Sequence, residues 1–315
     1  MKFASINLSD NRLQGEDVEV MIKNINILTK KIDLSKNKIG KYSLVLYPHL
    51  TVLKSDLRVL NLEKTALGDN TAVELITYAK KSVSLESLNL SENNLTDAIS
   101  SALIQTLDDH GTLKELYLRW NGLTDKFGKE FFGFFTQDTH VNRLPLKVLD
   151  LSYNCMGKGL KVIKDQPQRR GRGPVIPELS GSIKKFLDTN TKLVHLDFSS
   201  NKFRFEECID IRDGLKDNYT IFGFHFQGNY GYVDSEGFLV VDEMVKDFSS
   251  EHHARKIDSV NRLDNYHQFY QQIEAADARN CCWICDGWIE MKFEYTKSKK
   301  FIFFNLTNMK ELNQK

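Results

Sequence analysis

The stretch LESLNLSENNL (85–95) returns twice further along the chain, as LKELYLRWNGL (113–123) and LKVLDLSYNCM (146–156). Its pattern is L-x-x-L-x-L-x-x-N-x-L, with methionine at the last position of the third copy. Two leucines separated by one residue place their side chains on one face of a short strand. The asparagine that follows can both donate and accept hydrogen bonds where a turn leaves backbone groups inside the fold. Each copy therefore predicts one strand followed by one turn.

The same register extends over most of the chain and marks eight turn positions. They are separated by 26, 28, 28, 28, 33, 47 and 28 residues. A period in the high twenties with this phrase is the signature of leucine-rich repeats. One of the eight turn positions, Thr65, carries a hydroxyl group in place of an amide. We expect it to form the weakest hydrogen bonds of the eight. The positions are Asn11, Asn37, Thr65, Asn93, Asn121, Asn154, Asn201 and Asn229.

Amphipathic segments lie between the phrases. Residues 70–82 and 97–110 place apolar side chains at helical spacing, after Asp69 or Asn70 and Thr96 or Asp97 as N-cap candidates. A strand and a helix within 28 residues resemble the ribonuclease-inhibitor-like class of leucine-rich repeats. The resemblance implies an α/β solenoid, a horseshoe of about eight strand–helix repeats with a parallel sheet on its concave face, followed by a small α+β extension.

The repeat pattern divides the chain into three parts. Residues 1–233 form the leucine-rich repeat domain, with a basic loop inserted at about 157–176. Residues 234–280 are expected to hold a terminal helix, formed over 231–248, and a charged helical linker. Residues 281–315 hold a box of cysteine and tryptophan and a predicted β-hairpin, since residues 288–295 alternate and a turn separates them from 301–306.

Bulk properties exclude some classes of partner. The 315 residues carry a net charge of +1, with a sequence pI near 7.6, so nothing in the total charge draws the chain to nucleic acid or a membrane. No apolar run has the length of a spanning helix, and no signal peptide is visible. Of five cysteines, Cys155 and Cys208 are expected inside the solenoid, which fits a reducing compartment. We predict a soluble, cytoplasmic protein.

The first repeat lacks the polar cap that usually covers the end of a solenoid. Phe3, Ile6 and Leu8 already occupy strand positions. Either another chain, or a later part of this one, covers this end, or the edge is tolerated as it stands.

Stacked strands align the variable positions as columns across the concave face. Tyr117, Arg119, Trp120 and Tyr153 fall in the middle of that face, and these residue types dominate interface hot spots. The alternative is that the aromatic side chains only pack on their neighbours. The predicted protein-binding surface comprises Tyr117, Arg119, Trp120, Asp150, Tyr153, Asp197 and His225.

Asp150 and Asp197 occupy the same column in adjacent repeats, which raises the question of acid–base chemistry. No nucleophile, phosphate loop or metal triad accompanies them in the sequence, so polar filling of a solvated face is the favoured interpretation. His195 and His225 are likewise interpreted as surface or hydrogen-bonded histidines. The sequence predicts no catalytic residue and no cofactor.

The longest step between turns contains a basic insert rich in glycine and proline. Only Asp165 opposes its positive charges. A solvated loop is the simplest interpretation, and contact with an acidic protein surface is the second. Nucleic acid is disfavoured because the insert lacks aromatic residues for base stacking. The basic residues are Lys158, Lys161, Lys164, Arg169, Arg170 and Arg172.

Cys282-x-x-Cys285, next to Cys281, is a weak metal candidate. A structural zinc needs four ligands, and the nearby histidines lack finger spacing. Buried thiols packed with Trp283 and Trp288 are favoured. The box CCWICDGWIEMKFEY (281–295) resembles one found behind repeats of this class in large families of ciliate proteins. That resemblance implies a protist protein, from organisms in which repeat scaffolds are abundant in the ciliary axoneme.

These features favour a non-enzymatic protein–protein interaction scaffold, a structural or adaptor subunit of a larger cytoskeletal or axonemal assembly. The alternative is a regulator of small GTPases, because Ran GTPase-activating proteins resemble this repeat class. A zinc-dependent or hydrolytic enzyme is the third hypothesis.

Overall fold

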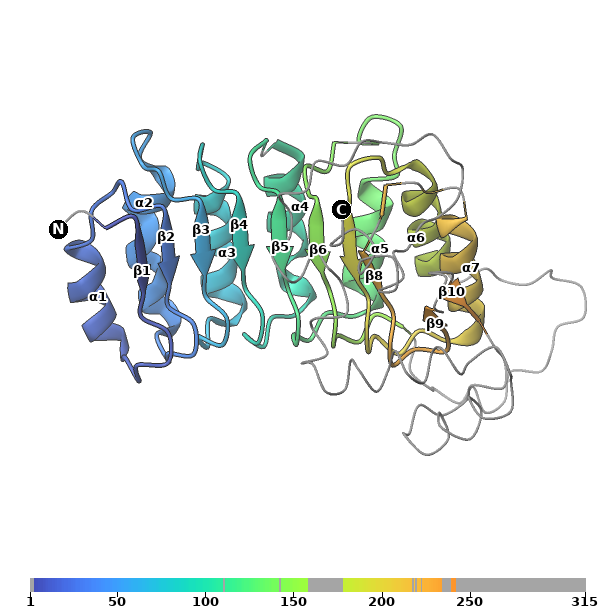
Figure 1. The fold of residues 1–315 in the computed structure, drawn as a ribbon, viewed down its shortest axis with the longest axis horizontal. Coiled ribbons are helices and arrows are strands. Elements are labelled where there is room, and N and C mark those ends of the chain that lie inside the picture. Colours follow the sequence, from blue (N-terminus) through green and yellow to red (C-terminus); the bar gives the residue numbers. More distant parts are fainter. Residues whose placement is uncertain are drawn as a thin grey trace, which may run out of the picture.

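Eight short parallel strands form one sheet in which each strand pairs with the next copy along the chain. The computed structural model describes residues 3–109, 111–141, 143–157, 178–216, 218, 220–221, 223–233 and 239–241. In Figure 1 the strands form one layer, and the helices form a second layer on one side of it. The predicted leucine-rich repeat solenoid is confirmed. The strands are β1 (Ser5–Asn7), β2 (Lys31–Asp33), β3 (Val59–Asn61), β4 (Ser87–Asn89), β5 (Glu115–Tyr117), β6 (Val148–Asp150), β7 (His195–Asp197) and β8 (Gly223–His225).

The central residue of each strand points into the core. Leu88 of β4 is in register with Leu116 of β5, which is in register with Leu149 of β6 across a 33-residue step. All three are buried. The residues on either side of them form the opposite surface of the sheet, which we call the strand face. Alternation of period two within three residues is therefore sufficient to separate core from surface.

Helices and 3-10 turns connect the strands on the other side of the sheet. The helix expected over 70–82 begins two residues earlier, and the one expected over 97–110 begins as a 3-10 turn. Thr96 caps that turn by accepting from the Ala98 backbone, whereas Asp69 lies inside its helix and accepts from Thr96 instead. The elements are α1 (Gly15–Lys23), η1 (Gly40–Leu46), α2 (Tyr47–Thr51), α3 (Gly68–Ala79), η2 (Asp97–Ile99), α4 (Ser100–Asp109), α5 (Asp125–Phe134), α6 (Glu178–Thr189) and α7 (Phe205–Leu215).

The core changes from leucine to phenylalanine along the solenoid. Phe132 of α5 contacts Phe186 of α6 and Phe198, which follows β7, with ring centroids 5.1 and 5.7 Å apart. Phe203 stacks on Phe226 at 5.9 Å. These larger side chains fill the interior of the later repeats, whose insertions lengthen the path between strands.

The turn asparagines connect neighbouring repeats. Asn93 donates to the Leu62 carbonyl of the preceding repeat at 2.7 Å and accepts from the Thr65 and Leu67 backbone at 3.0 and 3.2 Å. The Thr65 hydroxyl donates to the Leu62 carbonyl of its own repeat and to Asn93 of the next repeat, but to no carbonyl of the preceding repeat among the described residues. The asparagines that donate to a carbonyl of the preceding repeat are Asn37, Asn93, Asn121, Asn154, Asn201 and Asn229.

Two expectations were wrong. The helix over 231–248 is replaced, where the chain is described, by the antiparallel strands β9 (Tyr232–Val233) and β10 (Leu239–Val240). Leu239 is buried in the core, so packing against the last repeat overrides local helical preference. Cys155 is exposed rather than internal, because it follows the turn asparagine, while Cys208 is buried.

The outer edge of β1 has no strand beside it in the described part of the chain. Phe3, Val20 and Leu28 are exposed at this end. Coverage of this edge by a further chain stays a prediction.

Candidate functional site

An aromatic pair occupies the turns that follow β5 and β6. The rings of Trp120 and Tyr153 stack with their centroids 4.6 Å apart and 9° between their planes. Trp120 is 50% exposed and Tyr153 38%, the largest exposed aromatic surface in this part of the solenoid. The Trp120 backbone donates to the Ser152 carbonyl at 3.0 Å, which holds the two turns together.

Arg119 completes this cluster. Its guanidinium carbon lies 5.0 Å from the centre of the Tyr153 ring, within the range of a cation–π contact. Its Nε atom is excluded from solvent and has no hydrogen-bond partner among the described residues. We call Arg119, Trp120 and Tyr153 the aromatic platform.

The sequence suggested that these residues lie in the middle of the strand face. In the structure the platform lies at the rim of the sheet. Strand β5 ends at Tyr117, so Arg119 and Trp120 already belong to the turn. Trp120 and Tyr153 have φ angles of +53° and +55°, which turn the chain away from the sheet. Of the four residues predicted to lie in the middle of the face, only Tyr117 lies within a strand.

Local folding does not explain aromatic residues at these turn positions. The same position has a left-handed backbone in every repeat, and its other occupants are charged or small. Left-handed backbone favours glycine, asparagine and aspartate over bulky residues. Trp120 and Tyr153 are thus the two aromatic exceptions at this position. The other occupants are Asp10, Lys36, Lys64, Glu92, Ser200 and Gly228.

A second local rule is broken beside the platform. In six repeats an Asn or Asp at the strand end accepts a hydrogen bond from the backbone two residues later, as Asn89 does from Ser91 at 2.9 Å. Tyr117 occupies that position in the fifth repeat and cannot form the same closure before Arg119. Departures from a repeated local rule are where function is most often found.

The strand face next to the platform carries the acidic pair that the sequence singled out. Asp150 and Asp197 are in register on β6 and β7. Burial, together with the charge of Asp197, raises the pKa of Asp150 to about 6. Asp150 accepts from the backbone and hydroxyl of Ser152 at 2.9 and 2.6 Å, and Asp197 from the Ser199 backbone at 2.8 Å.

Two histidines lie on the same face. His195 of β7 is buried, and its ring centroid is 4.9 Å from that of His225 of β8. The structure thus gathers both histidines near the acidic pair. The sequence had placed His225 with Asp150 and Asp197 on the predicted binding surface, but had not placed His195 there. Within the described ranges, no group of three or more His, Cys, Asp or Glu side chains is arranged to hold a metal ion.

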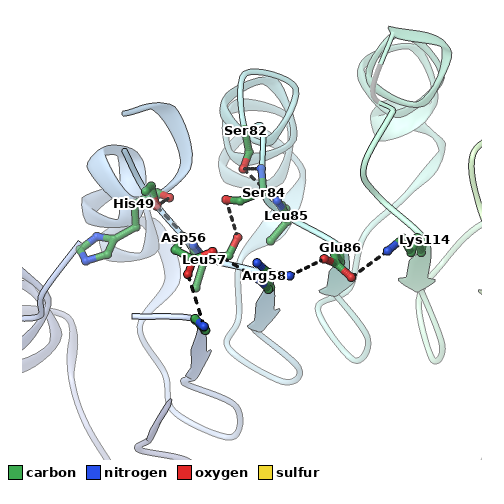
Figure 2. Close-up of polar contacts among 11 residues, drawn as sticks. His49, Asp56, Leu57, Arg58, Ser82, Ser84, Leu85, Glu86 and Lys114 are labelled. Carbon is green, nitrogen blue, oxygen red and sulfur yellow. Dashed lines mark hydrogen bonds and ion pairs between the residues drawn. The ribbon is translucent and has the colours of Figure 1, made fainter. Parts of the chain in front are cut away.

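The opposite rim of the sheet carries a line of ion pairs. Arg58 bonds Asp56 and Glu86, each at 3.2 Å, and Glu86 also accepts from Lys114 at 2.9 Å, as Figure 2 shows. Lys114 and Arg58 lower the pKa of Glu86. Exposed pairs of this kind contribute about 0–1 kcal/mol each, and the charges of these four residues already have partners.

A surface hollow of about 790 Å³ lies at the N-terminal end of the solenoid. Three cations and two carboxylates line it, and the ring of Tyr42 fills the space above Gly15. The charges largely cancel, so the hollow shows no preference for a ligand of either sign. The charged residues are Arg12, Glu16, Asp17, Lys36 and Lys38.

Two predicted groups lie outside the described residues. They are the basic residues between 158 and 172 and the cysteines at 282 and 285. Among the helices that are described, none is long and apolar enough to cross a membrane.

Comparison with known protein families agrees with this architecture. The model of the leucine-rich repeat family matches residues 81–103, 112–126 and 189–204. A solved structure titled "Leiomodin-1 Actin-Binding Site 2 (ABS2)" aligns over 67% of this chain and 82% of its own, with 12% identity and a TM-score of 0.28. No curated protein matches the sequence. The matched repeats and the eight stacked strands together show a leucine-rich repeat solenoid fold.

Proposed function

We propose that this chain is a non-catalytic scaffold that binds a protein partner through the aromatic platform. The observation that carries the proposal is the stacked, exposed pair of Trp120 and Tyr153 at turn positions where the other repeats place charged or small residues. Trp, Tyr and Arg are the residue types most enriched among interface hot spots.

The pair is held ready for binding. Asn121 and Asn154, which directly follow the two aromatic residues, are hydrogen-bonded to the preceding repeat. A surface whose side chains are already ordered loses less conformational entropy when a partner binds. The face also has room for contacts on either side, since seven strand spacings of about 4.8 Å span about 34 Å.

Site-specific cross-linking tests this proposal. A photo-reactive amino acid at position 153 should capture a partner in the native source, whereas the same group at position 36, in the same turn of an early repeat, should not. Trp120→Ala with Tyr153→Ala should weaken binding of the captured partner by about 30-fold or more, since a hot-spot side chain contributes about 2 kcal/mol. Equal capture from positions 153 and 36, or binding unchanged by the double substitution, would contradict the proposal.

The proposal includes two finer parts. A second contact would join the basic residues between 158 and 172 to an acidic surface of the partner, supported by their charge in the sequence. The setting would be a cytoplasmic cytoskeletal assembly, the ciliary axoneme, supported by the resemblance of the 281–295 box. Imaging of the tagged protein in ciliated cells tests the setting, and a diffuse distribution would count against it.

Regulation of small GTPases is a second candidate that no specific observation in the described residues favours. Its test is a GTP-hydrolysis assay with purified GTPases, in which stimulation by the chain would support it over the scaffold.

A further inference from the structure

Arg119 lacks the anionic partner that three other arginines of the described chain have. Arg58 pairs with Asp56 and Glu86, Arg143 with Asp108, and Arg212 with Asp213. The side chain of Arg119 makes no ion pair and no hydrogen bond within the described ranges; its contact is with the Tyr153 ring. A donor that is excluded from solvent and left unpaired costs about 1–3 kcal/mol, and more when it is charged.

The carboxylates near the platform already have donors of their own. Glu92, in the turn next to Trp120, pairs with Lys64 at 3.2 Å. Asp150 and Asp197 accept from the backbone of Ser152 and Ser199. No carboxylate of the described chain therefore satisfies Arg119.

A second cation lies on the same rim. The Nζ atom of Lys202 is 3.2 Å from the sulfur of Cys155, two residues after Tyr153, and has no carboxylate partner among the described residues. The rim around Tyr153 thus carries two uncompensated positive charges beside a flat aromatic surface. On the opposite rim, by contrast, Arg58 and Lys114 are paired with carboxylates.

We propose that the platform recognises an acidic segment of the protein partner, in which a carboxylate binds Arg119 and an adjacent aromatic side chain packs on Trp120. This inference rests on the proposed function and specifies the chemistry of the partner. A carboxylate can accept two parallel N–H bonds from a guanidinium, which is the geometry Arg provides and Lys does not. Stacking on Tyr153 holds the guanidinium in place for that contact.

Fluorescence anisotropy of labelled peptides with the full chain tests this chemistry. Three short peptides each contain a phenylalanine, flanked by Glu, by Gln or by Lys. The Glu peptide should bind at least about 10-fold more tightly than the Gln peptide, and its advantage should shrink as salt increases. The Lys peptide should bind most weakly.

Variants separate the role of Arg119 from that of the aromatic rings. Arg119→Gln should bring the Glu and Gln peptides to equal affinity, and Arg119→Lys should retain only part of the preference. Trp120→Ala should weaken all three peptides. Arg58→Gln is the matched control, an arginine on the opposite rim, and should change nothing. Unfolding curves of each variant confirm that the fold is kept.

The inference is overturned if the Gln peptide binds as tightly as the Glu peptide, if the preference survives Arg119→Gln, or if no peptide binds. Its failure is distinct from failure of the proposed function. If cross-linking from position 153 captures a partner that is lost on Trp120→Ala but is indifferent to Arg119→Gln, the platform binds protein and only the acidic chemistry is wrong.

Discussion

The indole of Trp120 lies parallel to the phenol ring of Tyr153, with the ring centroids 4.6 Å apart. The two residues are 33 positions apart in sequence and meet because the strands that precede them are in register. Both rings remain accessible, so the contact leaves an ordered aromatic surface and not a closed core. Removing one ring should therefore weaken partner binding strongly and the stability of the fold only slightly.

Trp120→Ala should lower the free energy of unfolding only slightly. The ring is half exposed, and an aromatic pair contributes about 0.5–1.5 kcal/mol beyond area burial. Chemical denaturation should therefore show a loss of about 1 kcal/mol. Leu116→Ala, in the middle of β5 and fully buried, should cost about 2–5 kcal/mol and serves as the comparison. An equal loss for both would mean that Trp120 is a core residue.

Asn93→Ala should be among the most destabilising polar substitutions. The side chain is fully buried, donates to Leu62 and Leu90, and accepts from the backbone of Thr65 and Leu67. Its removal leaves several buried groups unpaired, at about 1–3 kcal/mol for each group. We expect a loss of about 3 kcal/mol in denaturant unfolding.

Asn11→Ala is the matched control at the same register of the edge repeat. Asn11 is exposed, and its amide donates to Ser9 alone. The substitution should cost less than about 1 kcal/mol, because water can replace the lost bond. A similar loss for Asn11→Ala and Asn93→Ala would show that the turn asparagines do not stabilise the fold through buried hydrogen bonds.

Asp150→Asn should stabilise the protein at neutral pH and have little effect at pH 4. The pKa of Asp150 is raised to about 6 in the folded state from its ordinary value of 3.8, so between these values the folded chain holds a proton that the unfolded chain releases. Stability therefore falls as pH rises between these values and stays lower above them. At 1.36 kcal/mol per pKa unit, the gain on substitution is about 1–3 kcal/mol at pH 7.5.

Asp33→Asn is the control for this titration. Asp33 occupies the same column on β2, but its neighbours in register are Asn7 and Asn61, so no second carboxylate opposes it. Thermal unfolding measured from pH 4 to pH 8 should show a stability gain over the parent that grows with pH for Asp150→Asn but not for Asp33→Asn. A pH-independent difference between the Asp150 variant and the parent would remove the electrostatic explanation.

Much of the fold follows from residues that are close in sequence. The leucines and the turn asparagine recur at a fixed spacing, and each copy contains within eleven residues what is needed to form a strand and its turn. The register of Leu88, Leu116 and Leu149 could therefore be predicted even across the 33-residue step. The helix expected over 231–248 was wrong because its decisive contact, the burial of Leu239, lies in the last repeat and not in the local pattern.

The candidate site was only partly visible in the sequence. Its residue types were recognisable as Tyr, Trp and Arg near the middle of the chain, but their position at the rim depends on where the three-residue strand ends. The unpaired state of Arg119 could not be predicted, because it depends on which carboxylates lie within reach after folding. The same holds for the pKa of Asp150, which depends on the burial created by neighbouring repeats and on Asp197.

The sequence by itself determined the repeat: its period, the inward leucines, the asparagine turn and the parallel pairing of copies. A periodic pattern encodes these features locally, and each unit satisfies the same backbone requirements. Only the tertiary structure decided that Trp120 meets Tyr153, that Arg119 contacts a ring and no anion, and that Asp150 shares its surroundings with Asp197. These are relations between side chains of different repeats, set by the way the repeats stack.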